Sequence, residues 1–110
     1  MKIEEVQQEE IWKDVEGFPG YQVSNLGRIK SFRGWGKKET GHIMKPQVMH
    51  KKEKYRFVCL ARDGKRPYFA LIHRIVAIAF VPKTDEKCTK VAHRNYDVND
   101  NRACNLKWVR

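Results

Sequence analysis

Cysteine is scarce in this sequence of 110 residues, and long apolar runs are absent. Cys59, Cys88 and Cys104 are widely spaced, and no Cys-x-x-Cys pair occurs, so neither a disulfide framework nor a cysteine-based zinc site is indicated. No apolar run approaches membrane-spanning length, and the polar N-terminus is not typical of a signal peptide. The sequence therefore predicts a cytoplasmic protein of one domain, or two very small ones, with a modest core.

Acidic residues are also few beyond the first quarter of the chain. Residues 1–27 hold two basic and six acidic side chains, whereas residues 28–110 hold 21 and 7, a net charge of +14 within a formal total of +10. The electrostatic field of this positive charge attracts polyanions, of which nucleic acid is the commonest. A membrane surface is the other possibility, but no long basic amphipathic helix is visible. The charge therefore predicts a nucleic-acid partner and no membrane partner.

The stretch from residue 91 to residue 109 carries the residues best suited to chemistry. A short apolar strand leads to His93, a loop rich in Asn and Asp follows, and a second alternating strand ends at Val109. Two interpretations stay open from the residues alone. A histidine and an asparagine on facing strands could form a compact metal-dependent nuclease site, or the stretch could be a turn with a satisfied histidine.

This stretch resembles the core of the HNH endonucleases, in the form found in phage homing endonucleases. The resemblance implies that His93 is the general base that activates water and that the preceding residue binds a divalent metal such as Mg²⁺. It also implies that Asn105 braces the loop, and that the protein, if phage-encoded, acts in the cytoplasm of a bacterial host. The matching residues are Val91, His93, Asn101, Arg102, Asn105, Leu106, Trp108 and Val109.

The chain departs from the HNH pattern where the metal would bind. Ala92 precedes His93 and has no oxygen to offer, and residues 94–96 are Arg-Asn-Tyr where the family has Ile-Asp-Gly. The family pattern continues past Trp-Val into a helix with a second metal ligand, whereas this sequence ends at Arg110. A hard cation needs several oxygen ligands. No metal ligand is therefore certain, and the possible substitutes are Asn95, Asp97 and Asp100.

Residues 11–32 form a second motif of short strands separated by glycine turns. Its expected small core comprises Trp12, Tyr21, Val23 and Ile29. The run resembles NUMOD4, a module that accompanies HNH domains in phage homing endonucleases. The residues that fit this pattern are Trp12, Gly20, Tyr21, Val23, Ser24, Asn25, Gly27, Arg28, Ile29 and Ser31.

Residues 33–54 are basic and contain glycine, which predicts an exposed loop and then an extended piece near residues 43–48. The segment could contact phosphates, with Phe32 and Trp35 beside bases or sugars. It could equally be a solvated loop whose aromatic residues fold back onto the core. The predicted nucleic-acid contacts are Arg28, Lys30, Arg33, Lys37, Lys38 and Arg74.

The middle of the chain predicts a hairpin and a helix. Two β-rich runs, 55–62 and 68–72, flank Asp63-Gly64-Lys65-Arg66, and residues 73–80 have a helical apolar face that ends before Pro82. We expect His73 to be structural or to contact phosphate rather than to act in catalysis. The predicted class is α+β, with small antiparallel β-sheets and one short helix, ending in a truncated ββα-metal (HNH) hairpin.

Three regions and three functions follow from these patterns. The regions are an acidic lead-in (1–10), a NUMOD4-like DNA-contacting module (11–50) and an HNH-like domain lacking its last helix (51–110). The leading function is a DNA-binding protein related to HNH homing endonucleases, with lost or very weak nuclease activity. The alternatives are an active Mg²⁺-dependent HNH endonuclease or nickase with His93 as general base, and a phage-type inhibitor or regulator that acts on a host protein.

Overall fold

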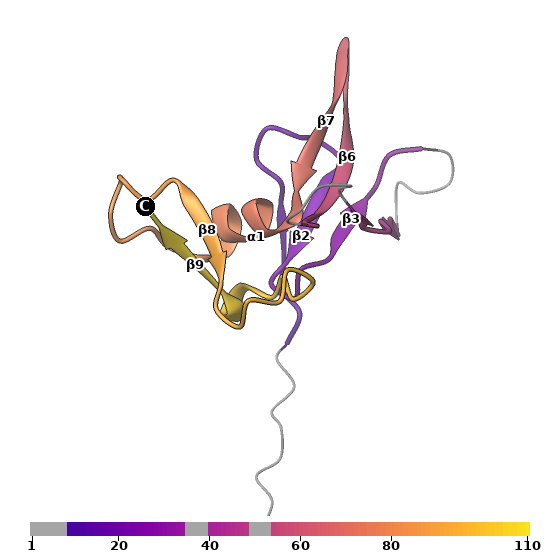
Figure 1. Cartoon of the computed structure of the whole chain (residues 1–110). Helices are drawn as coiled ribbons and strands as arrows, with labels where there is room; N and C mark the ends of the chain where they lie inside the picture. Colours follow the sequence, from indigo (N-terminus) through magenta and orange to yellow (C-terminus); the bar gives the residue numbers. More distant parts are fainter. Residues whose placement is uncertain (1–8, 35–39, 49–53) are drawn as a thin grey trace, which may run out of the picture.

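In the part of the chain that the structure describes, the fold consists of three small antiparallel sheets and one α-helix (Figure 1). A computed structural model describes residues 9–34, 40–48 and 54–110. The first sheet has the order β1-β2-β3-β4, the second has the order β5-β6-β7, and β8 pairs with β9. The predicted α+β class is confirmed. The elements are β1 (Trp12–Asp14), β2 (Tyr21–Ser24), β3 (Ile29–Ser31), β4 (His42–Ile43), β5 (Gln47–Val48), β6 (Arg56–Arg62), β7 (Lys65–Leu71), α1 (Ile72–Phe80), β8 (Lys90–His93), the 3₁₀ turn η1 (Ala103–Asn105) and β9 (Leu106–Val109).

The predicted Asn25-x-Gly27 turn joins β2 to β3 and reaches the C-terminal part of the chain. Gly27 has a φ of 87°, and a Cβ atom there would lie 2.8 Å from the backbone carbonyl of Asn101. Only glycine satisfies both the left-handed backbone and this close approach. The carbonyl of Asn25 accepts a hydrogen bond of 2.8 Å from the N–H of Ala103. The turn therefore packs the N-terminal sheet against the loop that leads into β9.

The hairpin of β6 and β7 projects from the body of the molecule (Figure 1). Arg62 pairs with Lys65, so the turn consists of two residues, Asp63 and Gly64, and β7 begins three residues earlier than the sequence predicts. Gly64 permits this tight turn because its φ is 70°. Residues 65–69 are exposed. The hairpin thus presents basic and aromatic side chains to solvent.

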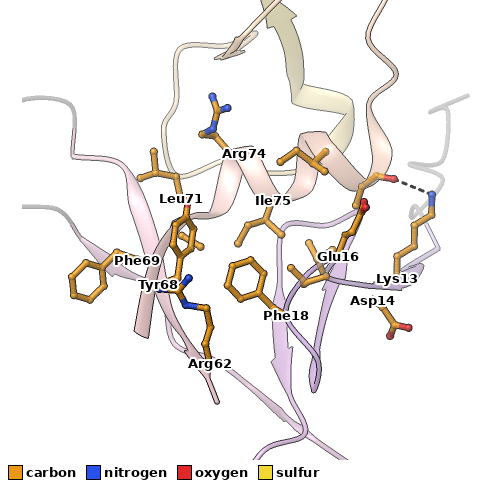
Figure 2. Close-up of a pocket in the computed structure, with 15 residues that line it drawn as sticks. Lys13, Asp14, Glu16, Phe18, Arg62, Tyr68, Phe69, Leu71, Arg74 and Ile75 are labelled. Atoms are coloured by element: carbon orange, nitrogen blue, oxygen red, sulfur yellow. Dashed lines mark hydrogen bonds between the residues drawn. The ribbon is translucent and has the colours of Figure 1, made fainter. Parts of the chain in front are cut away.

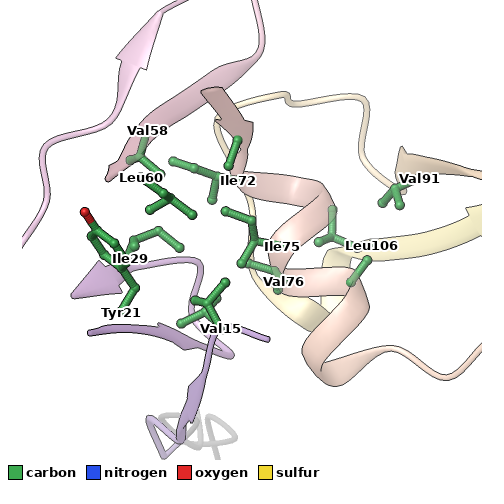
Figure 3. Packing of buried hydrophobic residues seen from close by; sticks show 13 residues of the cluster. Val15, Tyr21, Ile29, Val58, Leu60, Ile72, Ile75, Val76, Val91 and Leu106 are labelled. Atoms are coloured by element: carbon green, nitrogen blue, oxygen red, sulfur yellow. The ribbon is translucent and has the colours of Figure 1, made fainter. Parts of the chain in front are cut away.

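Helix α1 lies between the N-terminal sheets and the β8–β9 pair, and it organises a single core (Figure 3). It begins one residue before the predicted span and ends at Phe80, where Val81 donates its N–H to the carbonyl of Ala77. Three of the four predicted core residues of the N-terminal module are buried, whereas Trp12 is half-buried. The shared core contains Val15, Tyr21, Val23, Ile29, Val58, Leu60, Ala70, Ile72, Ile75, Val76, Ala77, Val91 and Leu106.

Because one core serves all three sheets, the His93 hairpin has a fixed position relative to the NUMOD4-like residues. The boundary predicted at residue 50 falls in the segment 49–53, which lies outside the described residues, and it stays a prediction. In the part of the chain that the structure describes, no helix is long and apolar enough to cross a membrane.

Candidate functional site

His93 ends strand β8, directly opposite Leu106 of β9. Its side chain is 7% exposed, and its Nε2 lies 2.8 Å from Oδ1 of Asn101. An amide oxygen only accepts hydrogen bonds, so Nε2 of His93 donates in this contact. Strand alternation turns Val91 and His93 inward, whereas Ala92 lies on the other face of the β8–β9 pair.

Tyr55, His73 and His93 form a compact aromatic cluster beneath this strand. The ring of His73 lies 4.7 Å from that of Tyr55 and 5.1 Å from that of His93, measured between centroids. His73 is 4% exposed, and its burial, together with the nearby His93 and Arg74, lowers its pKa to about 4. His73 is therefore neutral at pH 7. This burial favours the structural interpretation of His73 over contact with a phosphate.

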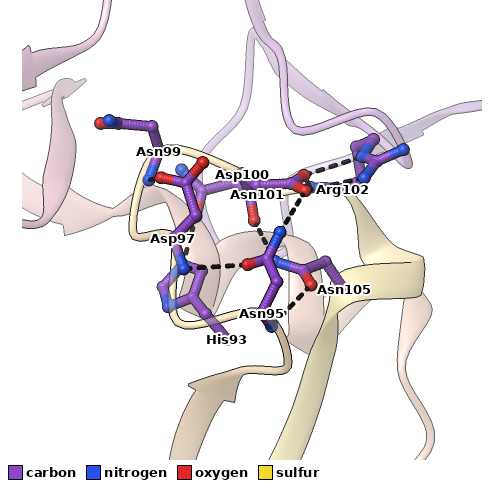
Figure 4. Close-up of polar contacts among 8 residues, drawn as sticks. All are labelled: His93, Asn95, Asp97, Asn99, Asp100, Asn101, Arg102 and Asn105. Atoms are coloured by element: carbon purple, nitrogen blue, oxygen red, sulfur yellow. Dashed lines mark hydrogen bonds and ion pairs between the residues drawn. The ribbon is translucent and has the colours of Figure 1, made fainter.

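Asn105 occupies the centre of the loop that joins β8 to β9 (Figure 4). Its Oδ1 accepts the N–H of Asn95 at 3.2 Å, and its Nδ2 donates to Asn95 Oδ1 and to the carbonyl of Asp100, each at 2.9 Å. One side chain thereby joins both ends of the loop. These are the contacts that a loop-bracing residue would make.

The possible substitute metal ligands of this loop are engaged with one another rather than directed at a shared point (Figure 4). Asn95 Nδ2 donates to Asp100 Oδ2, and Asn95 Oδ1 accepts the N–H of Asp97. The guanidinium of Arg102 binds both carboxylate oxygens of Asp100 and lowers the pKa of that carboxyl group. Asp97 Oδ1 accepts the N–H of Asn99 at 3.0 Å.

These donors do not fit the divalent metal that an HNH site implies. Ala92 contributes a methyl group, and the loop carboxylates and amides are already used in local hydrogen bonds. Within residues 9–34, 40–48 and 54–110, no group of three His, Cys, Asp or Glu side chains is arranged to hold a metal ion. A hard cation would have to replace several of these bonds to obtain its oxygen ligands.

Two of the predicted nucleic-acid contacts, Arg28 and Lys30, meet around one aromatic ring. The Lys30 ammonium lies 4.2 Å and the Arg28 guanidinium 5.6 Å from the ring centre of Trp12. Arg28 also forms an ion pair with Glu10, which lowers the pKa of that carboxyl group. This pair neutralises part of the predicted basic surface. Other predicted contacts lie outside the described residues, namely Lys37, Lys38 and the aromatic Trp35.

The other two, Arg33 and Arg74, lie apart from this pair. Arg33 bonds Asp63 at the tip of the hairpin at 2.7 Å. Arg74 donates to the carbonyl of Thr89 at 2.9 Å and stands between two cavities. Among the described residues, the four predicted contacts Arg28, Lys30, Arg33 and Arg74 therefore do not share one set of partners.

The larger of those cavities, about 650 Å³, lies between β1, β7 and α1 (Figure 2). Phe18, Tyr68 and Ile75 line it, with Arg62 and Arg74 at its border. No residue of the loop after His93 contributes to it. It is therefore separate from the candidate HNH site.

The hairpin tip is a basic surface that was not predicted. Lys65 and Arg66 are exposed, and neither forms an ion pair with another described residue. Phe69, on the same strand, is 70% exposed. The sequence did contain a signal for this surface, because Lys65 and Arg66 directly follow the Asp63-Gly64 turn. A tight turn at that point places both cations near the end of a β-hairpin.

Comparison with known proteins agrees with both resemblances. The family model described as the NUMOD4 motif matches residues 10–61. An uncharacterized HNH endonuclease of Acanthamoeba polyphaga mimivirus is 38% identical over 91% of this chain and 24% of its own length. A solved structure described as DNA binding and cleavage by the HNH homing endonuclease I-HmuI matches with a TM-score of 0.73 and 33% identity, covering 90% of this chain and 52% of that one.

The chain thus spans about a quarter of the length of the viral relative and about half of the solved endonuclease chain. The similarity nevertheless extends over most of this chain in both comparisons, and therefore well beyond residues 10–61. Over most of its length the chain is similar to HNH endonucleases, including a homing endonuclease, and its residues 10–61 match the NUMOD4 motif.

Proposed function

We propose that this chain is a DNA-binding protein whose own nuclease activity is lost or very weak. The observation that carries DNA binding is the match of 90% of the chain to a structure described as DNA binding and cleavage by an HNH homing endonuclease. The net charge of +14 on residues 28–110 supports the same partner. Phosphate contacts made by such a surface supply affinity without regard to sequence.

The β6–β7 hairpin is the element best placed to enter a DNA groove. It is a two-stranded ribbon that projects from the core, and the major groove is about 12 Å wide and accepts such a ribbon. Lys65 and Arg66 lie near its end and are not neutralised by a described acidic residue. Lys30 and Arg28, around Trp12, form a second basic position, of which Arg28 is paired with Glu10.

The geometry around His93 supports loss of cleavage. A general base typically contributes only ~10²–10⁴-fold to a reaction rate, whereas enzymes reach about 10⁶–10¹⁷-fold overall. In a metal-dependent nuclease the ion stabilises the charge that develops on the phosphate. With a methyl group at Ala92 and the loop oxygens engaged in hydrogen bonds, His93 lacks the groups that would hold such an ion.

A binding experiment tests the first half of the proposal. We expect fluorescence anisotropy with a 20-base-pair duplex to give an affinity that falls steeply between 50 and 300 mM salt, with a log–log slope of roughly −0.9 per phosphate contact. Lys65→Ala with Arg66→Ala should flatten the slope by about 2. Lys83→Ala with Lys87→Ala, two exposed cations of the linker before β8, is the matched control. Binding that is absent at 50 mM salt, or insensitive to salt, would refute DNA binding and favour a protein partner.

A nicking experiment tests the second half. We expect supercoiled plasmid to remain intact with the unmodified chain in Mg²⁺ or Mn²⁺ under conditions in which the duplex is bound. His93→Ala should then change nothing. Robust metal-dependent nicking that is lost on His93→Ala would instead support the alternative, a nuclease with His93 as general base. The retained position of His93 and the names of both relatives are the observations that keep this alternative in view.

A further inference from the structure

Tyr96 is a strained and almost fully exposed aromatic residue in the loop after His93. Its side chain is 92% exposed, and its φ is 62°, in the left-handed region that disfavours bulky side chains. It stands three residues after His93, where the HNH pattern has glycine, which would adopt this φ without strain. Packing in the described core does not explain the tyrosine, since its ring is in solvent.

The loop holds Tyr96 in place from both sides. Its N–H donates to the carbonyl of His93 at 3.1 Å, and the next residue, Asp97, donates its N–H to Asn95 Oδ1 at 2.9 Å. Asn95 is bonded in turn to Asn105. An exposed aromatic ring on a braced loop loses little conformational freedom when it binds a flat partner.

A cavity of about 430 Å³ lies beside this ring, in the range typical of small-molecule sites. Its lining includes the rings of Tyr55, His73, His93 and Tyr96. Two cations also contribute to its lining, Arg74 from α1 and Lys90 from β8, and no acidic side chain does. His73 lines this cavity and is 4% exposed as a whole residue. No hydrogen bond joins its side chain to another described residue, and no fully buried side-chain nitrogen of the described residues lacks a partner. The ring nitrogens of His73 are therefore not fully buried and are available to a ligand in the cavity.

We propose that Tyr96 and this cavity bind one unstacked nucleobase of the bound DNA, an inference that rests on the proposed DNA-binding function. A nucleobase is flat and aromatic with polar edges, which matches a cavity lined by Tyr96, Tyr55 and the imidazole of His73. Its flanking phosphates are anionic, which matches Arg74 and Lys90. An acidic partner would use only the cations Arg74 and Lys90, and a purely aliphatic partner would use only the ring faces.

The test compares two duplexes with the same number of base pairs. One is fully paired, and the other carries one additional unpaired nucleotide as a bulge. Stacking on an aromatic side chain is sequence-tolerant and corresponds to roughly 5- to 150-fold in affinity. We expect the unmodified chain to bind the bulged duplex at least about 5-fold more tightly. Tyr96→Ala should remove this preference, because the stacking face is lost. Tyr96→Phe should keep the preference, because the stacking face remains.

Tyr96→Gly separates binding from folding, because glycine suits the left-handed backbone. Its melting temperature should equal or exceed that of the unmodified chain, while the preference for the bulge is lost. Binding to both duplexes with no preference in the unmodified chain, or a preference that survives Tyr96→Ala, would overturn this inference and leave DNA binding standing. Failure to bind either duplex would overturn the proposed function and this inference with it.

Discussion

The buried imidazole of His73 should make the stability of the fold depend on pH between about pH 6.5 and pH 4. Its pKa in the folded chain is lowered to about 4, first by burial and then by the neighbouring His93 and Arg74. An unperturbed histidine in the unfolded chain titrates near 6.5. Tyr55 is the other ring packed against it and brings no charge that would favour the protonated form.

The direction follows from which state binds more protons. Above pH 6.5 His73 is neutral in both states and its contribution to stability is complete. As the pH falls below 6.5, the unfolded chain binds a proton at His73 that the folded chain does not bind, so the free energy of unfolding decreases. The loss is about 2 kcal/mol at pH 5 and levels off near about 3 kcal/mol below pH 4. Whole domains have about 5–15 kcal/mol, so a loss of this size is readily measured.

Urea unfolding followed by tryptophan fluorescence at pH 8 and pH 5 measures this effect. With a slope of about 1–3 kcal/mol per molar urea, the midpoint of the unmodified chain should drop by roughly 1–2 M. His73→Phe keeps a ring of similar shape against Tyr55 but cannot bind a proton, so its midpoint should change little over the same range. His42→Phe, at an exposed histidine, is the matched control and should behave like the unmodified chain.

Two outcomes would refute this reasoning. If the unmodified chain is equally stable at pH 8 and pH 5, His73 is not buried in neutral form. If His73→Phe keeps the full pH dependence, another group is responsible. The carboxyl groups of Asp100 and Glu10 do not interfere, because their ion-pairing arginines lower both pKa values and their contributions are lost only at lower pH.

Two further changes test the His93 hairpin. Trp108→Ala should destabilise the chain by about 3 kcal/mol, because the half-buried indole packs on the core and donates to the carbonyl of Val81 at 2.7 Å. Trp108→Phe keeps most of the packing and should cost only about 1 kcal/mol. An unchanged urea midpoint for the alanine variant would contradict this packing. Ala92→Asp should give at most weak Mg²⁺-dependent nicking of plasmid, since one carboxylate supplies a single ligand, and cleavage at the rate of an efficient endonuclease would show that the remaining ligands are already in place.

The parts of the fold that the sequence predicts are those set by local pattern. The Asp63-Gly64 turn, the helix before Pro82 and the core around Tyr21 follow from turn chemistry and apolar periodicity. Long-range pairings are different, because no local pattern encodes them. The neutralisation of Arg33 by Asp63, thirty residues away, and of Arg28 by Glu10 depends on how the sheets pack. The sequence therefore did not identify the acidic partners of Arg28 and Arg33, and it did not single out Lys65 and Arg66 at the hairpin tip.

Trp108 illustrates the same limit, since its apolar neighbours predict a buried ring. In the structure it is half-buried, with Lys83 4.4 Å from its ring centre. The hydrogen bond to the carbonyl of Val81 explains this position, because the indole N–H reaches the end of α1 only if the ring lies at the border of the core. The polar N–H of a tryptophan determines how deeply the side chain is buried, and the sequence does not identify the hydrogen-bond partner of that N–H.

The polar side chains of the loop after His93 bond one another, and this bears on what the loop can bind. Among the described residues, no fully buried side-chain nitrogen or oxygen lacks a hydrogen-bond partner. A metal entering the loop would have to break bonds such as those of Asp100 to Arg102 and to Asn95, and the guanidinium would lose its carboxylate. The same bonds fix the backbone on which Tyr96 is displayed. A loop that satisfies its own polar groups and still holds an aromatic ring in a strained, solvent-facing position is better arranged to bind a ligand by contact than to coordinate a cation.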